Sequence, residues 1–492
     1  MFPFMCEDRR QSRAFIAFII YISLFLDNML LTVIVPILPD YLVHFYSSAN
    51  FTIPSSVIYK NFDLHYVPKL IGASSGHVPL TNVTTERSVS LESENGSIGI
   101  LLGVKALVQL ICNPIVGNVS LRIGYSLPIL FGTLNLLVAS AIFAFGQSYA
   151  SLFVARAVHG VGSACISVCG MSLVAQLYVE PDKRSKIMGT ILGSIAVGVL
   201  IGYPFGGITY DLVGKAAPFH ILSVLCLFTL IMQLATLDLT VRHHSSSIVV
   251  EDGGSRWWPL LTNRLILIIV GAIWISTSAM SILEPCLPLW MMSMLHPKKW
   301  QLGTVFIPDS IGYWVGTNFF GGIAYRFGQI KVAILALTLV GVSCILIPSA
   351  TAVFELLLPH FGLGLGIGVL DAALVPLLAT LVDSQSGSDT ESDSCESSPN
   401  YGAVYAVQQI AVSLAYSAAP ILGGELVPLI GFPWLMRTIG ILNLAYGPLL
   451  IYSGIRESVR IVLQKRSELP LTSALDPVAD GSNYRRFYNA VN

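Results

Sequence analysis

The segment GNVSLRIG, at residues 117–124, recurs as GGIAYRFG at residues 321–328, and this repeat is the strongest indication of the architecture. Each copy follows a long apolar run, and both keep the spacing Gly-x4-Arg-x-Gly. A second matched pair, GYPFGG at 202–207 and APILGG at 419–424, again lies at equivalent places in the two halves of the chain. Two such pairs predict a duplicated protein with a similar set of helices in each half.

Twelve apolar runs, six in each half, are long enough to cross a bilayer with a hydrocarbon thickness of about 30 Å. They cover residues 15–42, 98–119, 126–146, 150–178, 187–212, 218–239, 265–294, 302–325, 332–349, 354–382, 401–425 and 432–454. The chain is 54% hydrophobic and only 11% charged, which excludes an ordinary soluble domain. The sequence therefore predicts an all-α integral membrane protein with twelve transmembrane helices in two six-helix halves.

The polar segments between these runs predict the domain organisation. The N-terminal half covers residues 1–239 and contains a lumenal loop at about 43–97. A cytoplasmic linker at 240–263 leads to the C-terminal half at 264–455, which contains an acidic Ser-rich cytoplasmic loop at about 384–399. A cytoplasmic tail follows at 456–492. The acidic loop fits a solvated linker, with phosphorylation as the alternative. Its role is left open.

Both termini are predicted to be cytoplasmic, because Lys and Arg gather in the loops on that side of the twelve spans. Three N-glycosylation sequons support this orientation, at Asn50, Asn82 and Asn95 in the first long loop. Such sites are used only in the lumen. A fourth match, at Asn118, falls at a cytoplasmic helix end and is assigned no role.

The overall charge points to no charged partner. The formal net charge is −1, so nucleic-acid binding is not predicted. The eight cysteines are scattered, without a CxxC pair or a Cys/His spacing typical of a metal site. We therefore expect no metal and no cofactor, and we expect the function to lie inside the membrane.

Five ionisable residues stand out well inside the predicted spans, where a charge costs at least about 2.5 to 3.5 kcal/mol at a helix centre. They are Asp27, Lys105, Arg156, Glu284 and Asp371. Three acids and two bases predict mutual pairing around one polar cavity. Asp309, near the lumenal end of the eighth span, is expected to be solvated instead.

The acids suggest specific roles. Asp27, followed by Asn28, can hold an ammonium group by charge and hydrogen bond, and the alternative is a structural ion pair with Lys105. Glu284 precedes Pro285, which interrupts the helix as transporter binding sites often require, and the alternative is a kinked helix with a satisfied acid. Asp371 lies in a Gly-rich span, and a desolvated acid there is suited to carrying a proton.

The bases can act as counter-charges that let the acids change partner. Lys105 and Arg156 are the two candidates. Arg156 fits a purely structural role equally well, since an Arg side chain stays charged and does not relay protons. His159, one turn further on, is a group that can titrate near neutral pH, with an ordinary buried and hydrogen-bonded histidine as the alternative.

Several motifs together resemble the vesicular amine transporters of the major facilitator superfamily. They are LDNMLLTVIVPILPDYL from Leu26, KALVQLICNP from Lys105, ARAVHGVGS from Ala155, LEPCLPLWMM from Leu283, KWQLG from Lys299 and GFPWLM from Gly431. KWQLG followed by SIGYWVGTNFFG from Ser310 is closer to the monoamine transporters than to the acetylcholine transporters. The resemblance implies a proton-coupled antiporter that moves cytosolic serotonin, dopamine, octopamine or a similar amine into acidic synaptic or secretory vesicles.

The resemblance also implies residue roles. Asp27 and Asn28 match the amine-binding pair, and Glu284 matches the second acid that faces the substrate. The charge network for proton coupling is matched by Lys105, Arg156 and Asp371. Tyr313 and Tyr416 match the aromatic residues at the gates. The expected partners are the amine, protons and the lipid bilayer. We expect a monomer that is not an enzyme.

Two departures from the family pattern stand out. Where the family carries an acid in the eleventh span, the segment VYAVQQ from Val404 places Gln409. Lys105 then lacks that partner and is expected to pair with Asp27 or Asp371. The family's lumenal disulfide is also expected to be absent, because the first loop has no Cys and His296 stands at the partner position.

Other functions remain as alternatives at this point. The nearest are a vesicular acetylcholine transporter and a plasma-membrane exporter of polyamines or drugs. A channel or a non-transporting amine sensor would belong to a different class. Duplicated halves with internal acids and bases favour a transporter over a channel.

Overall fold

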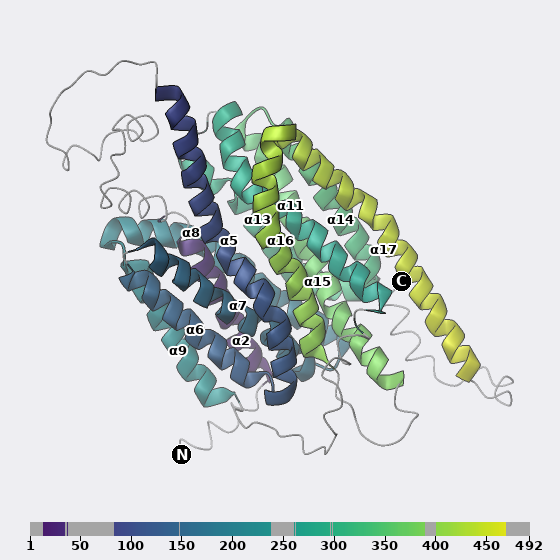
Figure 1. Cartoon of the computed structure of the whole chain (residues 1–492). Helices are drawn as coiled ribbons and strands as arrows, with labels where there is room; N and C mark the ends of the chain where they lie inside the picture. The colour runs from purple at the N-terminus through teal and green to yellow at the C-terminus, as the bar shows by residue number, and fades with distance from the viewer. Residues whose placement is uncertain are drawn as a thin grey trace.

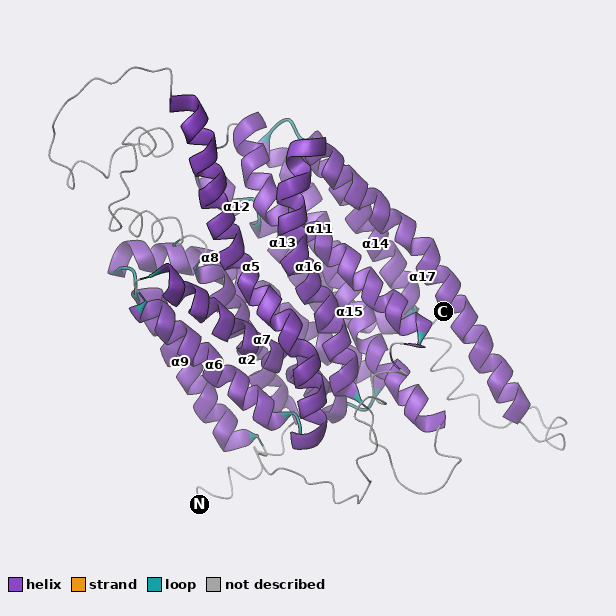
Figure 2. Cartoon of the chain, in the orientation of Figure 1, coloured by secondary structure: helices purple, strands orange, loops and turns teal. Residues whose placement is uncertain are grey.

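We describe a computed structural model of the chain. The structure describes residues 13–34, 37, 83–146, 148–237, 260, 262–295, 297, 299–388 and 400–468. Within these residues all regular structure is helical (Figure 2). Asn50, Asn82 and His296 lie outside the described residues, as do most of the predicted linker and tail.

Twelve long helices run through the described part of the chain (Figure 1). The first six are α2 (Arg13–Val33), α5 (Val83–Ile123), α6 (Ser126–Phe145), α7 (Tyr149–Leu177), α8 (Pro181–Val213) and α9 (Ala217–Thr236). The second six are α11 (Arg264–Met294), α13 (Ile307–Phe327), α14 (Gln329–Leu346), α15 (Leu357–Ser388), α16 (Tyr401–Ile430) and α17 (Phe432–Glu468). Short helical turns at Lys299–Thr304, Ile347–Ser349 and Val353–Leu356 connect elements of the second half.

Eleven of these helices are long and apolar enough to span a membrane, and α13 is the exception. Its polarity is tolerated because α13 packs closely against α15 and α8. A Cβ atom at Gly316 would lie 2.7 Å from the amide nitrogen of Val369 in α15, so only glycine permits this approach. One face of α13 is thus covered by protein and buries Asp309, Ser310 and Thr317, while apolar side chains such as Phe319 stay exposed on the other face.

α5 begins further upstream than expected. The first loop was predicted to extend to about residue 97, whereas the helix starts at Val83. Asn95 therefore lies within helical backbone, and its use as a glycosylation site stays a prediction.

The helix pairings repeat between the two halves. α2 packs on α8 as α11 packs on α16, α5 on α7 as α13 on α15, and α6 on α9 as α14 on α17. Between the halves, α5 packs against α16, and α13 packs against α8. These two contacts correspond to each other, because α13 is the counterpart of α5 and α8 is the counterpart of α16. The packing therefore has the two-fold character that the repeated motifs predict.

Glycines with positive φ end corresponding helices in both halves. Gly124 (φ 81°) follows α5 and Gly328 (φ 98°) follows α13, while Gly214 (φ 122°) follows α8 and Gly431 (φ 80°) follows α16. Residues with a Cβ rarely adopt these conformations, so glycine is required to end each helix. Gly124 and Gly328 are the last residues of the repeated motif, which explains why the motif ends in glycine.

Polar contacts join the halves at two levels. Asn113 of α5 donates a hydrogen bond to Ser413 of α16 at 3.0 Å, and both residues lie near the middle of their spans. Ser185, near the start of α8, donates to the backbone oxygen of Gly321, toward the end of α13, at 2.7 Å. The predicted topology makes the end with the Ser185 contact the cytoplasmic one.

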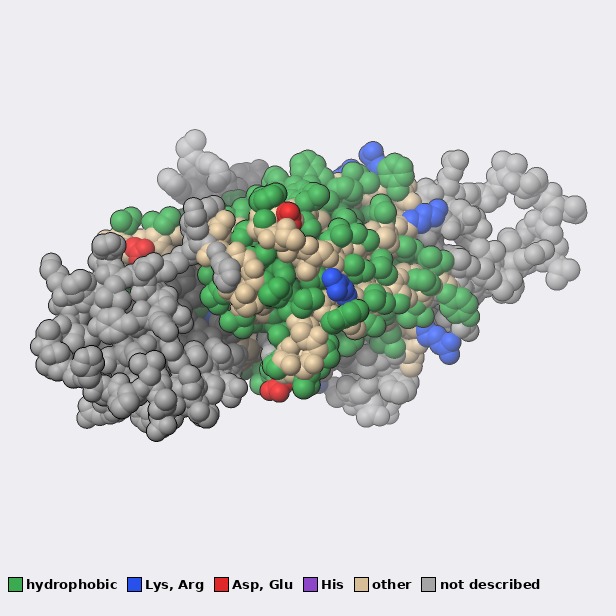
Figure 3. Space-filling view, turned by 90° about the horizontal axis from the view of Figure 1, so that it is seen from above, with side chains coloured by type: hydrophobic (Ala, Val, Ile, Leu, Met, Phe, Trp, Pro, Cys, Tyr) green, Lys and Arg blue, Asp and Glu red, His purple; other side chains and the backbone are tan. Residues whose placement is uncertain are grey.

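The outer surface suits a bilayer. Viewed from above, the described surface is mostly apolar with scattered charged side chains (Figure 3). Along α9, Val224, Phe228 and Ile231 are 66%, 57% and 56% exposed and recur at helical spacing on one face. Exposed apolar side chains of this kind are expected where a helix faces lipid.

Candidate functional site

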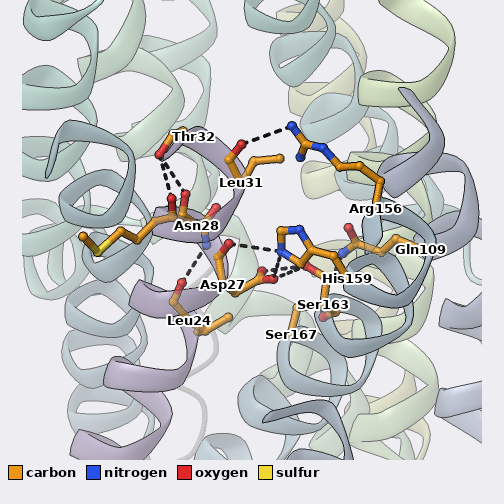
Figure 4. Close-up of polar contacts among 11 residues, drawn as sticks. Leu24, Asp27, Asn28, Leu31, Thr32, Gln109, Arg156, His159, Ser163 and Ser167 are labelled. Carbon is orange, nitrogen blue, oxygen red and sulfur yellow. Dashed lines mark hydrogen bonds and ion pairs between the residues drawn. The ribbon is translucent and has the colours of Figure 1, made fainter. Parts of the chain in front are cut away.

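The best-defined polar cluster lies in the N-terminal half, between α2 and α7 (Figure 4). Asp27 of α2 is 4% exposed, and its Oδ1 atom lies 2.9 Å from Nε2 of His159. Ser163 Oγ lies 2.5 Å from Oδ1 and 2.6 Å from Oδ2 of the same carboxylate. Asp27 is therefore held by two side chains of α7, and the hydrogen bonds offset part of the cost of burying it.

The helical period explains why these partners come from one element. Arg156, His159 and Ser163 are separated by three and four residues and share one face of α7. Arg156 is completely buried, and its Nη2 donates to the backbone oxygen of Leu31 at 3.4 Å. Its Nε and Nη1 atoms have no hydrogen-bond partner among the described residues. This face of α7 therefore contacts α2 at two places, with Arg156 at Leu31 and with His159 and Ser163 at Asp27.

The next polar side chains along α2 bond within their own helix. Asn28 Nδ2 donates to the backbone oxygen of Leu24 at 2.8 Å, and Thr32 Oγ1 donates to that of Asn28 at 3.1 Å. Asn28 is half-buried beside Asp27. It is thus next to the acid, as the sequence requires, without bonding to it.

Lys105 interacts with this cluster through charge rather than contact. It is 8% exposed on α5, and it interacts electrostatically with both Asp27 and Arg156. No Lys105–Asp27 ion pair within 4.0 Å joins these two described side chains. The direct partner of Asp27 is His159, so the alternative of a Lys105–Asp27 contact pair does not hold in this conformation.

The acids of the C-terminal half gather around two tyrosines. Tyr313 of α13 donates to Oδ2 of Asp371 in α15 at 2.9 Å, and Oδ1 of Asp371 has no partner among the described residues. Tyr416 of α16 interacts electrostatically with Glu284, Asp309 and Asp371. The predicted residues of this half therefore do come together, on four different helices.

Tyr203 links the two groups of residues. Its hydroxyl, on α8, lies 3.5 Å from Oε1 of Glu284 on α11. Tyr203 also interacts electrostatically with Arg156. Tyr203 thereby connects Glu284, a half-buried acid of the C-terminal half, to Arg156, a buried base of the N-terminal half. The sequence analysis did not single out Tyr203, although it belongs to the repeated motif at 202–207.

The expectation that Asp309 is solvated is wrong. Asp309 is 8% exposed in the first turn of α13, and its Oδ1 has no partner among the described residues. A Cβ atom at Gly364 of α15 would lie 2.8 Å from that oxygen, so α15 covers the carboxyl group. Glu284 interacts with Asp309 electrostatically. The reason is packing. Hydropathy places the start of α13 near water, but α15 covers it, because Gly364 lets the two helices come close together.

Comparison with known proteins identifies the family. A sequence model of the Major Facilitator Superfamily matches residues 17–387 and 269–479. The synaptic vesicular amine transporter of Rattus norvegicus is 37% identical, over 91% of this chain and 89% of that protein. The chain belongs to the vesicular amine transporter family. The rat chromaffin granule amine transporter is 36% identical over 90% of this chain and 88% of its own length.

Within this family, the similarity to the acetylcholine branch is lower. The rat vesicular acetylcholine transporter is 31% identical, over 94% of this chain and 86% of that protein. The expected closer resemblance to the monoamine transporters is therefore confirmed. The human organic anion transporter MFSD10 (TETRAN) has a similar structure, with a TM-score of 0.65 and 16% identity over 89% of this chain and 99% of that one. That likeness concerns the fold alone.

Gln409 and Lys105 lie on two helices that pack side by side. Gly402 of α16 lies against Gly117 of α5, and Ser413 of α16 bonds to Asn113 of α5, so the two helices run antiparallel. Gln409 is half-buried and follows the buried Gln408.

Proposed function

We propose that this chain exchanges lumenal protons for cytosolic monoamines and so loads them into acidic synaptic or secretory vesicles. The amine is held between the halves, by Asp27 on one side and Glu284 on the other, with Asn28, Tyr313 and Tyr416 near it. Relatives named as vesicular amine transporters support the substrate class.

The observation that carries the proposal is the placement of carboxyl groups on both sides of the half interface, with Asp27 buried and Glu284 and Asp371 half-buried. Asp27 belongs to α2, and Glu284 and Asp371 belong to α11 and α15. Buried acids in a membrane bind either a proton or another cation, because an unpaired carboxylate is costly there. A protonated amine and a proton therefore compete for the same groups, which is the requirement for antiport.

The amine-facing acids also have aromatic neighbours. Tyr203 lies beside Glu284, and Tyr416 interacts with the acids of the C-terminal half. A cation over an aromatic face gains about 0.5 to 2 kcal/mol. This environment suits an aromatic amine, whose ring and ammonium group need different contacts.

The transport cycle follows from the two halves. Contacts at the end where α8 begins support a conformation closed on that side, which the predicted topology makes cytoplasmic. Lumenal protons taken up by Asp371, and by Glu284, would favour return to a cytoplasm-facing state, with Lys105 and Arg156 as counter-charges. Each exchanged proton contributes about 1.4 kcal/mol per pH unit, enough for a tenfold amine gradient.

Uptake of labelled amines into acidified vesicles tests the proposal. Vesicles containing the chain should accumulate labelled serotonin, dopamine or octopamine, and a proton uncoupler should abolish the accumulation. Accumulation that survives the uncoupler would contradict proton coupling. Labelled acetylcholine is the matched alternative substrate, since an acetylcholine transporter is also a relative.

The orientation has its own test. Enzymatic removal of N-glycans should increase the electrophoretic mobility of the expressed chain, and the triple variant Asn50→Gln, Asn82→Gln, Asn95→Gln should already have the higher mobility. Unchanged mobility, together with labelling of the first loop from the cytoplasmic side, would exclude the proposed topology.

A further inference from the structure

We propose that His159 is a proton-exchanging partner of Asp27, so that a proton on His159 and an amine at Asp27 exclude one another. The inference rests on the proposed function and adds to it a titratable group on α7. His159 is a positioning residue in this scheme, because it acts on the amine through Asp27.

The contact geometry supports this assignment. His159 is completely buried, and its Nε2 atom faces both Oδ1 of Asp27, at 2.9 Å, and the backbone oxygen of Asp27, at 3.2 Å (Figure 4). Two acceptors on one ring nitrogen require that nitrogen to carry a hydrogen. The other nitrogen, Nδ1, has no hydrogen-bond partner among the described residues. It is therefore the atom on which a second proton can be placed without breaking the contact with Asp27.

A proton at Nδ1 changes the charge that Asp27 offers. With a neutral ring, Asp27 is a carboxylate hydrogen-bonded by His159 and Ser163, and its negative charge can attract an ammonium ion. With an imidazolium ring, the same contact becomes an ion pair and neutralises that charge. The amine and the proton bring equal positive charge to one carboxylate. Exchange of one for the other leaves the total charge of the cluster unchanged.

The charged surroundings of His159 come from three helices. Asp27 of α2 is the acid, and Lys105 of α5 and Arg156 of α7 are the two bases that interact with His159 electrostatically. Cys226 of α9 interacts electrostatically with Asp27, and Tyr203 of α8 with Arg156, so both belong to the wider cluster. His159 thus lies between one acid and two bases.

The decisive variant is His159→Gln. Glutamine can keep an N–H donor toward Asp27 but cannot take up a proton. The measurement is the slope of the logarithm of the amine accumulation ratio against the pH difference across the vesicle membrane. The slope should fall by about one in His159→Gln, which is a tenfold loss of accumulation per pH unit. Because the slope is an equilibrium quantity, it does not depend on expression level or transport rate.

Ser163→Ala is the matched control. It removes a hydrogen bond to the same carboxylate without removing a titratable group, so the slope should stay at the wild-type value even if affinity falls. A wild-type slope in His159→Gln would overturn the inference. So would an equal reduction of the slope in both variants, because that would assign the effect to the positioning of Asp27 alone.

A second measurement separates this inference from the proposed function. In purified protein with 15N-labelled histidine, the His159 signal is identified by its loss in His159→Gln. It should change from the neutral to the doubly protonated form between about pH 8 and pH 5. A signal that stays neutral over this range would exclude the role, whether or not amines are transported. A titrating signal in a protein that accumulates no amine would instead reject the proposed function.

Discussion

Arg184 and Asp383 form an ion pair that ties the two halves together at one end of the bundle. Arg184, completely buried near the start of α8, donates Nη1 to Oδ2 of Asp383 in α15 at 2.8 Å and Nη2 to Oγ1 of Thr380 at 2.9 Å. Tyr401, at the start of α16, donates to the other oxygen of Asp383. Three helices from both halves thus meet at one carboxylate. The sequence analysis did not single out this pair.

Breaking the pair should favour opening of this end. Asp383→Asn leaves the buried guanidinium of Arg184 without a counter-charge, and we expect the closed conformation to lose about 1 to 3 kcal/mol relative to the open one. The measurement is the labelling rate of a cysteine introduced at Ala403, which is buried near the start of α16, with a membrane-impermeant thiol reagent applied from each side. The rate from the cytoplasmic side should rise in Asp383→Asn.

Arg184→Lys is the matched comparison for that experiment. It keeps the charge but loses the fork that contacts Asp383 and Thr380 together. An intermediate labelling rate is expected. Equal rates in the unsubstituted protein and in Asp383→Asn would show that the pair does not hold this end closed.

Asp27→Asn should abolish proton-driven amine uptake while the protein remains folded. The substitution removes the negative charge that holds the ammonium group, but an amide oxygen still accepts hydrogen bonds from His159 and Ser163. Uptake is measured in vesicles, and folding by size-exclusion elution and correct targeting. Asp27→Glu, which keeps the charge, should retain partial uptake. Wild-type uptake in correctly targeted Asp27→Asn would remove Asp27 from the binding site.

Gln409→Asp should steepen the dependence of amine accumulation on the pH gradient, whereas Gln409→Asn should not change it. The new carboxyl group would be half-buried next to the buried Gln408, where an unpaired carboxylate is costly, so it would take up a proton. The measurement is the slope of accumulation against the pH difference. If the two variants give the same slope, position 409 lies outside the coupling network.

The order of apolar and polar residues along the chain was sufficient to predict the membrane fold. Helix length and hydropathy are local properties, so the twelve helices could be located from the sequence. The repeated glycine motifs predicted the duplication, because a positive φ at a helix end requires glycine regardless of what surrounds it. Asp27, Glu284 and Asp371 could be selected in the same way, since an acid within an apolar run is visible without knowing its partner.

The partner of each acid, in contrast, was decided by the tertiary structure. Each residue turns a helix by about 100° and advances it by 1.5 Å, so contacts depend on the rotation and axial position of whole helices. These settings come from packing, and hydropathy does not specify them. They bring His159 and Ser163 rather than Lys105 to Asp27, and they cover Asp309 with α15. The sequence determined which groups the membrane has to accommodate, and helix packing determined how they are paired.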